Sequence, residues 1–280
     1  MSRLTFRDKV EVCHQYTTRL KAAQDKDISR IFPEPSGPIS IKRAQVRPIG
    51  RALAWKVISR YEWLGTLPGC SHFYGIFFDN HCGGVACFSV GWVGAGINVP
   101  GWMGADAKQI AYLSRGACVH WAPKGTAPKL INRASLMTGC EVAIAYADTD
   151  AGEIGTVYQA AGWTCLGKGA SVPQYVSPQG RAYDGKLPYN MVLKKRGLTW
   201  IMARDALMDA GWKEQKSNPK WRYAKLLPSG KSNPTLLNRF EVSATAYPKR
   251  DLRQPLREPG SQSGNDGSIP ILALHLPGDP

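Results

Sequence analysis

Two apolar runs in the first third of the chain have the length and composition of β-strands. They cover residues 73–78 and 84–90, and the sequence DNHCG between them favours a turn. This pattern predicts an antiparallel hairpin. Before the hairpin, residues 47–61 are expected to form a strand and then a helix, because apolar positions in the second half recur at helical spacing.

Strand and helix patterns alternate through the middle of the chain. Residues 110–121 have the pattern of a strand, and the helix expected at 128–137 starts at a proline, with Thr126 or Ala127 as its cap. Residues 110–167 as a whole follow the order strand, helix, strand, helix, strand. This order predicts parallel βαβ units with right-handed crossovers.

The second βαβ unit has unusual residues at its junctions. A buried strand around Ile144 ends at Asp148, which is a turn former. The next helix, expected at 153–161, ends at Gly162, because glycine readily takes the left-handed conformation that closes a helix. Trp163 then starts another strand. The junction after the buried strand is the edge at which open α/β sheets bind their ligands.

The two ends of the chain lack this regular alternation. The expected domains are an N-terminal arm and linker at 1–45, a catalytic domain at 46–195, a basic DNA-contacting extension at 196–246 and a disordered tail at 247–280. Further expected elements are an amphipathic helix at 6–23, a glycine- and tryptophan-rich loop at 91–104 that covers or lines a pocket, a hairpin at 176–184, a strand at 189–193 and a helix at 200–210.

The charge of the chain narrows the class of partner. Its 36 Lys and Arg residues against 21 Asp and Glu residues give a formal net charge of +15. A surplus of this size favours a polyanion, and nucleic acid fits better than an acidic small molecule. Net charge by itself indicates only non-specific binding. A basic protein without a nucleic-acid role therefore stays an alternative.

Cysteine usage and the N-terminus indicate the compartment. Seven cysteines without a C-x-x-C pair indicate neither a disulfide framework nor a zinc knuckle. The N-terminus lacks the apolar core of a signal peptide, and no apolar run approaches the roughly 18 residues of a membrane span. A cytoplasmic protein with reduced thiols and no membrane partner is therefore expected.

Asp148 and Tyr158 are the candidate catalytic residues. Asp148 lies at the carboxyl end of a strand and Tyr158 in the middle of the next helix, so both are expected to point toward one crevice. A carboxylate accepts or orients the proton of an attacking amine, and a phenol donates a proton to a leaving group. The alternative is an aspartate that caps a turn and a tyrosine that packs in the core.

The sequence VYQAAGW, residues 157–163, resembles the tyrosine-x-x-x-glycine-aromatic ending of GNAT acyltransferases, in which the tyrosine often protonates the departing thiolate. The string AYADTDAGEIGTVYQAAGW, preceded by YLSRGACVHWAPKGTAPKLINRAS, resembles a narrower branch, the phage Mom proteins, which add a carbamoylmethyl group to N6 of adenine in DNA. The resemblance covers residues 46–227. It implies an α/β fold with a GNAT-like mixed sheet and flanking helices, and it gives Asp148 and Tyr158 catalytic roles.

GNAT proteins bind the pyrophosphate of acetyl-CoA or a related acyl donor at backbone amides between a strand and the following helix. Here that place holds Lys124, Gly125 and Thr126, which offer a cation, a glycine and a hydroxyl. Arg115 and Ser135 complete the expected donor site. The usual glycine-rich loop of the family is not present, and two prolines remove amides, so a different donor stays an alternative.

A metal is the second cofactor to consider. Relatives tend to have a histidine beside aromatic residues, and this histidine has been connected with iron binding. Glu62, between Tyr61 and Trp63, occupies that place here, so a histidine-based site is not supported. Oxygen ligands hold metals such as iron in other proteins, so an iron site with oxygen ligands stays an alternative.

The segment 213–225 is the expected DNA-contacting surface. It interleaves cations with aromatic residues, and its candidates are Lys216, Lys220, Trp221, Arg222, Tyr223 and Lys225. Cations bind phosphates, and an aromatic ring stacks on or wedges beside a base that is unpaired or flipped. The alternative is an ordinary edge strand with basic residues on its outer side.

These features together predict a transferase that adds a carbamoylmethyl group to N6 of adenine in double-stranded DNA and protects that DNA from restriction. The host cytoplasm is the expected location if a phage encodes the chain. One alternative is an acetyl-CoA-dependent N-acetyltransferase that acts on an amine or a protein. The other is a non-catalytic DNA-binding protein.

Overall fold

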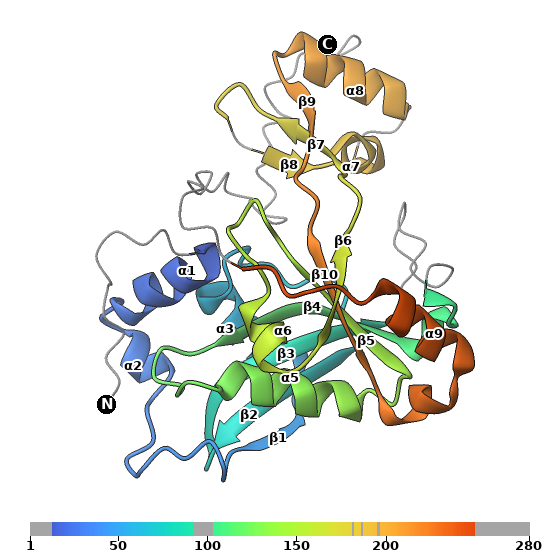
Figure 1. The fold of residues 1–280 in the computed structure, drawn as a ribbon. Helices are drawn as coiled ribbons and strands as arrows, with labels where there is room; N and C mark the ends of the chain where they lie inside the picture. The colour runs from blue at the N-terminus through green and yellow to red at the C-terminus, as the bar shows by residue number, and fades with distance from the viewer. Residues whose placement is uncertain (1–12, 92–102, 181, 186, 195–196, 250–280) are drawn as a thin grey trace. The chain divides into compact units, whose positions relative to one another are not determined.

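The computed structural model describes residues 13–91, 103–180, 182–185, 187–194 and 197–249 (Figure 1). The chain folds as two compact units. The main unit contains the described residues up to Gly169 and those from Lys220 onward, and the second unit contains residues 170–219. Each unit has its own apolar core.

A seven-stranded mixed sheet forms the centre of the main unit. In spatial order the strands are β1 (Gln45–Pro48), β2 (His72–Phe78), β3 (His81–Val90), β4 (Ile110–Cys118), β5 (Val142–Ala147), β10 (Trp221–Leu226) and β6 (Thr164–Lys168). The strands from β1 to β4 pair antiparallel, β4 and β5 pair parallel, and β10 pairs antiparallel with β5 and with β6. The expected α/β class, a mixed sheet with flanking helices, is confirmed.

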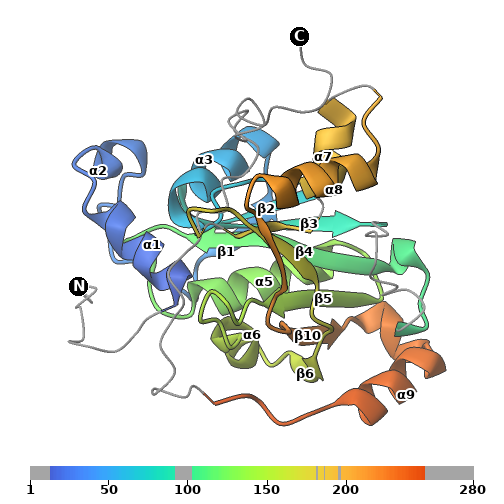
Figure 2. The ribbon, with the colours of Figure 1, turned by 90° about the horizontal axis from the view of Figure 1, so that it is seen from above.

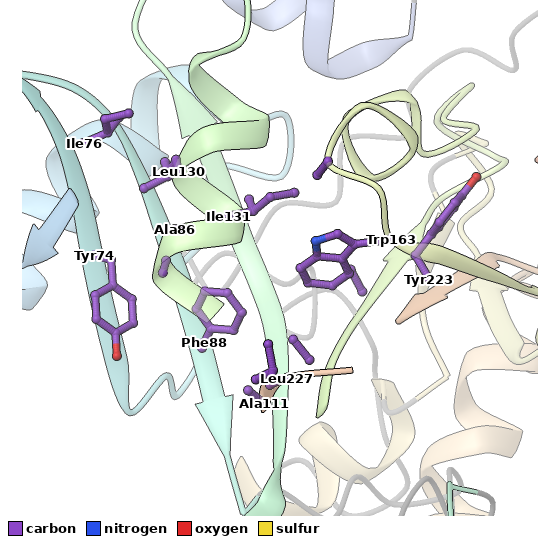
Figure 3. Packing of buried hydrophobic residues seen from close by; sticks show 14 of the residues in the cluster. Tyr74, Ile76, Ala86, Phe88, Ala111, Leu130, Ile131, Trp163, Tyr223 and Leu227 are labelled. Atoms are coloured by element: carbon purple, nitrogen blue, oxygen red, sulfur yellow. The ribbon is translucent and has the colours of Figure 1, made fainter. Parts of the chain in front are cut away.

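Helices cover both faces of this sheet (Figure 2). The alternation of side chains along β3 decides which residues meet which helix. Val85 and Cys87 join the core under α3 (Arg51–Tyr61), whereas Phe88 joins the opposite core under α5 (Thr126–Met137). Trp163 lies in that second core as well (Figure 3).

The remaining elements of the main unit lie around this layered core. They are α1 (His14–Ala23), α2 (Ile28–Ile31), the 3-10 helices η1 (Ala107–Gln109) and η2 (Pro228–Ser232), α6 (Thr156–Ala160) and α9 (Pro234–Ser243). Helix α1 contacts α3, and α6 contacts α5. Among the described helices, none is long and apolar enough to cross a membrane.

Strands β4 and β5 separate toward their carboxyl ends. They pair over three residues only, the last pair being Tyr112 and Ile144. In the same region the register between β3 and β4 shifts by one residue, from Phe88 opposite Leu113 to Cys87 opposite Arg115. A bulge of this kind bends a strand, and it accounts for the divergence of β4 from β5.

The second unit is a small sheet with two helices. It contains β7 (Pro173–Val176), β8 (Ala182–Asp184), β9 (Lys213–Lys216), α7 (Leu187–Lys194) and α8 (Trp200–Asp209). Its core includes Tyr175, Met191, Leu207 and Trp212. The strand expected at 189–193 is wrong, because this segment is the helix α7. Leu187 and Met191, one helical turn apart, both enter the core, which satisfies helical spacing instead of strand alternation.

Several other expectations hold. The hairpin of β2 and β3, the parallel β4–α5–β5 unit, the hairpin of β7 and β8 and helix α8 are confirmed. The cap of α5 is Gly125 rather than Thr126 or Ala127. The expected loop at 91–104 and tail at 247–280 lie almost entirely outside the described residues, and so do residues 6–12 of the helix expected at 6–23.

The two units do not follow the expected domain ranges. Residues 221–226, placed by sequence in a C-terminal extension, form β10 inside the main sheet. The reason is physical: Tyr223 and Ala224 are fully buried between β5 and β6, and an extension would leave them in water. The segment that leaves the main unit is 170–219 instead.

Candidate functional site

Asp148 follows the last residue of β5, at the end where β4 and β5 separate. It is buried, with 8% of its surface exposed. Its carboxylate forms an ion pair with Lys220, with 2.6 Å between Nζ and Oδ2, and accepts a hydrogen bond from the Asp150 amide at 3.0 Å. Asp148 is therefore a partnered carboxylate.

Glu153 is a second carboxylate in the same loop, and sequence reasoning did not select it. Its Oε2 accepts a hydrogen bond from the backbone amide of Asp148 at 3.2 Å. Burial raises the pKa of Glu153 to about 7, and the nearby Asp148 and Glu62 carboxylates raise it further, against the opposing effect of Lys220. A carboxyl group with this pKa exchanges protons near neutral pH. The only sequence signal was its position five residues after Asp148.

Tyr158 lies on α6 with its ring between two aromatic neighbours. Its ring centroid is 5.7 Å from that of Trp163 and 5.2 Å from that of Tyr223. Burial raises the pKa of the Tyr158 hydroxyl, and the Glu153 and Glu62 carboxylates add to this shift. The hydroxyl stays protonated at neutral pH and makes no hydrogen bond to any residue within the described ranges. It is thus a proton donor without a partner in the described chain.

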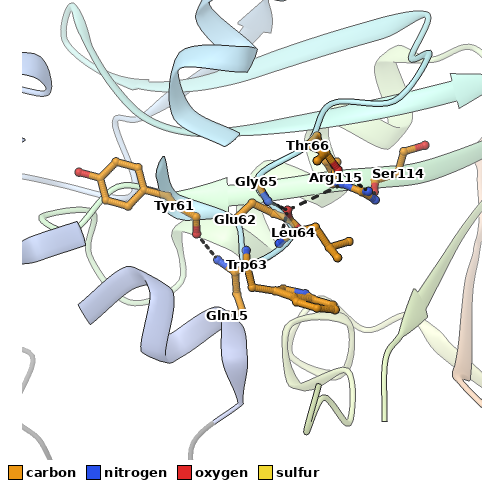
Figure 4. Close-up of polar contacts among 9 residues, drawn as sticks. All are labelled: Gln15, Tyr61, Glu62, Trp63, Leu64, Gly65, Thr66, Ser114 and Arg115. Carbon is orange, nitrogen blue, oxygen red and sulfur yellow. Dashed lines mark hydrogen bonds and ion pairs between the residues drawn. The ribbon is translucent and has the colours of Figure 1, made fainter. Parts of the chain in front are cut away.

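Glu62 is the second carboxylate that raises the pKa of Tyr158, and Figure 4 shows its polar contacts. It follows α3, has 7% of its surface exposed, and its Oε2 accepts hydrogen bonds from the amides of Leu64 at 2.9 Å and Gly65 at 3.0 Å. Burial raises its pKa to about 7, although Arg115 lies 3.8 Å away and lowers it. The site therefore has two carboxyl groups that titrate near neutrality beside one protonated phenol.

Arg115, expected to face the donor, binds the loop after α3. Its Nε donates to the Thr66 carbonyl at 2.8 Å and its Nη1 to the carbonyl of Ser114 at 2.7 Å. The adjacent Glu62 carboxylate adds an ionic contact. Arg115 therefore supports the position of Glu62 in this structure.

The expected donor residues are spread along α5. Lys124 and Gly125 are exposed at the start of this helix, and Gly125 adopts a left-handed conformation with φ of 89°. Thr126 is buried, and its hydroxyl donates to the Pro123 carbonyl at 2.7 Å. Ser135 is fully buried near the other end of the helix, about 13 Å further along the axis, so it does not join the first three.

This turn fits a phosphate group only in part. The Lys124 cation and the helix N-terminus suit an anion. The Thr126 amide, however, already donates to the Pro123 carbonyl at 3.2 Å, and Pro128 has no amide to offer. Fewer amides are available here than at an ordinary helix start.

The six expected nucleic-acid residues differ in accessibility. Lys216 is exposed on β9 of the second unit, whereas Tyr223 is fully buried and donates its hydroxyl proton to the Ile154 carbonyl at 2.5 Å. Lys225 donates to Asn132 at 2.7 Å. The half-exposed Lys220 forms the ion pair with Asp148 that is described above. Trp221 and Arg222, both partly buried, lie on β10 beside Tyr223.

The residues that the structure describes give no support for iron. Within the part of the chain that the structure describes, no group of three or more His, Cys, Asp or Glu side chains could hold a metal ion. The place of the expected histidine is taken by Glu62, whose Oε2 is already bound by two amides.

The family model of the Mom protein family matches residues 43–249, which include every strand and helix of the site described above. The chain belongs to the Mom family. Membership in this family agrees with the expected DNA modification. Among solved structures, an acetyltransferase of Bacillus subtilis in complex with CoA is similar at 8% identity and a TM-score of 0.32, over 66% of this chain and 98% of that one. No curated protein matches the chain.

Proposed function

We propose that this Mom-family protein is a transferase that adds a carbamoylmethyl group to N6 of adenine in double-stranded DNA and thereby protects the DNA from restriction. One observation carries the proposal. Asp148 and Glu153 lie in one loop at the end of β5, where β4 and β5 separate, and the amide of Asp148 donates to the Glu153 carboxylate; the Glu153 and Glu62 carboxylates both raise the pKa of Tyr158. Family membership and the net charge of +15 support DNA as the substrate.

The target nitrogen requires help from the protein. The lone pair of adenine N6 is delocalised into the ring, so N6 must be oriented and must lose a proton as it attacks. The Asp148 carboxylate pairs with the Lys220 ammonium and accepts a hydrogen bond from the Asp150 amide, and this fixed position suits it to orient the N6 amine as a hydrogen-bond acceptor. Glu153, with a pKa of about 7, is the better proton acceptor.

Tyr158 assists the departure of the leaving group from the donor. N6 forms a bond to an electrophilic carbon of the donor, and the bond from that carbon to the leaving group breaks. The electron pair of this bond goes to the leaving group, which takes a proton from the Tyr158 hydroxyl. The proton lost from N6 goes to Glu153, so the charges balance over the two groups. Burial raises the pKa of Tyr158, so its hydroxyl carries the proton at neutral pH.

The proposed second substrate is related to the expected acyl-CoA donors, but acetyl-CoA itself would leave an acetyl group on N6. Transfer of a carbamoylmethyl group requires a donor whose electrophilic carbon is a methylene that carries both the carboxamide and the leaving group. Lys124 and Gly125 at the start of α5 would meet its phosphate groups. The shortage of free amides at Thr126 and Pro128 favours a looser phosphate contact than a glycine-rich loop gives.

The test is mass spectrometry of nucleosides from plasmid DNA grown in cells that express the chain or its Tyr158→Phe variant. We expect a heavier deoxyadenosine with the wild-type chain alone, and the mass difference identifies the transferred group. Unmodified DNA from well-expressed wild-type protein would contradict the proposal. Turnover of acetyl-CoA without DNA would then favour an N-acetyltransferase, and salt-sensitive DNA binding without turnover a non-catalytic DNA-binding protein.

A further inference from the structure

We propose that helix α1 is part of the catalytic unit and that its Gln15 and Arg19 are positioning residues for two loops of the site. Helix α1 spans His14–Ala23 and therefore precedes the residues 43–249 that match the family model. This inference rests on the proposed function for its effect on catalysis. The contacts that carry it are side-chain hydrogen bonds to loop backbone.

Gln15 holds the backbone on both sides of Glu62 (Figure 4). Its Nε2 donates to the carbonyl oxygen of Tyr61 at 2.5 Å, and its Oε1 accepts a hydrogen bond from the amide of Trp63 at 3.3 Å. One side chain thus fixes the peptide groups before and after Glu62. The Glu62 carboxylate can turn only within the limits that these two bonds set.

The same loop is held from the opposite side by β4. Arg115 binds the Thr66 carbonyl at 2.8 Å and lies 3.8 Å from the Glu62 carboxylate. Glu62 is therefore fixed between Gln15 of α1 and Arg115 of β4. Rigid support from two elements is what a group near reacting atoms requires, since a displacement of about 1 Å reduces rates by as much as about 100-fold.

Arg19 binds the loop that leads from β4 into α5. Its Nε and Nη2 donate to the Val119 carbonyl at 3.1 and 2.8 Å, and Nη2 also donates to the carbonyls of His120 at 3.1 Å and Ala122 at 2.7 Å. Three carbonyl oxygens therefore turn toward one guanidinium. This loop continues directly into the turn before α5, where we place the donor phosphates.

The orientation of these carbonyls matters for an anion. Carbonyl oxygens carry partial negative charge and repel phosphate, whereas backbone amides attract it. Arg19 holds the negative ends of three peptide groups and adds a positive charge next to the turn. Arg19 therefore prepares the loop for a negatively charged donor without touching it.

A third contact joins α1 to the loop of the carboxylates. The amide of His14 donates to the carbonyl of Ala151, which lies between Asp148 and Glu153, at 3.1 Å. The His14 ring also meets the edge of the Trp63 ring, with centroids 5.5 Å apart. One helix thus connects the loops that hold Glu62, the donor turn and Glu153.

The test uses the purified full chain and the variants Gln15→Ala and Arg19→Ala, with Arg30→Ala as matched control. Arg30 lies in the same arm, has 80% of its side chain exposed and pairs only with Asp27 in the described residues. The readouts are amide hydrogen exchange, binding of CoA by calorimetry and the amount of modified deoxyadenosine in cellular DNA.

We expect separate effects from the two variants. Gln15→Ala raises exchange at residues 62–65, lowers modification about tenfold or more, and changes CoA affinity less than about twofold. Arg19→Ala raises exchange at residues 119–126 and weakens CoA binding about tenfold, because three loop carbonyls lose their charged hydrogen-bond donor and the turn before α5 loses a nearby positive charge. Arg30→Ala behaves as wild type in all three readouts.

Two results would overturn the inference. One is amide hydrogen exchange at residues 62–65 and 119–126 that is the same in both variants as in the wild-type chain. The other is faster exchange through all strands of the main sheet, which would mean that α1 only stabilises the fold. If the wild-type chain leaves DNA unmodified, the proposed function is wrong. The hydrogen-exchange data still show in that case whether α1 holds the two loops.

Discussion

At the scale of single residues, the three carboxylates of the site differ because their partners differ. Asp148 has the Lys220 ammonium group at 2.6 Å. Burial removes Glu153 and Glu62 from water without a cation at that distance, and it raises the pKa of each to about 7. We infer that Asp148 orients the substrate and that Glu153 takes its proton.

Removing one oxygen tests the proposed acid. Tyr158→Phe keeps the ring contacts with Trp163 and Tyr223 but removes the proton, so we expect modification to fall by about 100-fold or more. DNA binding should stay within about twofold of wild type, because the hydroxyl makes no contact on which the DNA surface depends. Nucleoside mass spectrometry and a filter-binding assay measure the two quantities. Tyr74→Phe, which removes a hydroxyl bound to Met137, is the control for loss of a buried phenol.

Asp148→Ala should also abolish modification with little change in DNA affinity. The substitution removes the acceptor that we assign to the N6 amine and leaves Lys220 without its 2.6 Å partner. The same two assays apply. Normal modification by both Asp148→Ala and Tyr158→Phe would show that the site assignment is wrong.

The raised pKa of Glu153 predicts a pH dependence. A carboxyl group accepts a proton only when ionised, so the rate should rise from pH 6 to pH 8 with a midpoint near 7. Asp148, Glu62 and Lys220 face the same group and shift this midpoint together. Glu153→Gln should slow modification by about 100-fold and remove this rise.

Stability provides an independent check on Glu153. Its pKa is raised in the folded state, so ionisation opposes folding as the pH increases from the unfolded value of 4.5 to about 7. Glu153→Gln should therefore raise the melting temperature more at pH 8 than at pH 4. An equal change at both pH values would mean that the carboxyl group is not desolvated.

At the scale of elements, a glycine decides where α6 starts. A helix expected at 153–161 begins only at Thr156, because Gly155 before it is left-handed, with φ of 74°. A Cβ at Gly155 would overlap the ring of Tyr223. The close approach of this loop to β10 brings Tyr158 beside Tyr223.

Gly155→Ala should destabilise the main unit by about 3 kcal/mol, which combines the left-handed backbone with overpacking. Gly139→Ala is the matched control, because Gly139 has φ of 73° and no atom within 4 Å of a built Cβ. It should cost only about 1 kcal/mol. Denaturant unfolding of both variants gives the comparison. Equal losses would mean that the Tyr223 ring moves aside without cost.

At the scale of the whole molecule, residues far apart in sequence build one sheet and one site. Lys220 stands at the start of β10 and pairs with Asp148, 72 positions earlier, because β10 lies next to β5. The 50 residues between Gly169 and Lys220 form the separate second unit. The strand that the sequence assigned to a DNA-binding extension thus lies inside the main sheet.

The net charge of +15 predicts salt-dependent binding to duplex DNA. Affinity should fall linearly with salt on a logarithmic plot, with a slope of about −0.9 for each phosphate neutralised. Lys216→Ala, on the exposed β9, should reduce this slope by about one unit for any DNA sequence. Lys225→Ala, whose ammonium binds Asn132, is the control that should leave the slope unchanged. A slope that does not depend on Lys216 would remove it from the DNA surface.

The sequence by itself determined the local elements and pointed to two residues of the candidate site. In residues 72–90, two strand-forming runs and the turn between them predict the hairpin, and in residues 156–163 the helical pattern and its final glycine predict α6. These signals come from residues that are neighbours in the chain. Asp148 and Tyr158 were visible for the same reason, since both stand at fixed positions in one βαβ unit. Family resemblance added the expected chemistry to those positions.

Only the tertiary structure decided what surrounds them. Glu153 is distinguished by burial, Glu62 by its place beside Tyr158, and Lys220 by the pairing of β10 with β5. Gln15 and Arg19 meet the site across 46 and about 100 positions of sequence. Desolvation and long-range contacts depend on the packing of distant segments, and the pattern of neighbouring residues does not encode them.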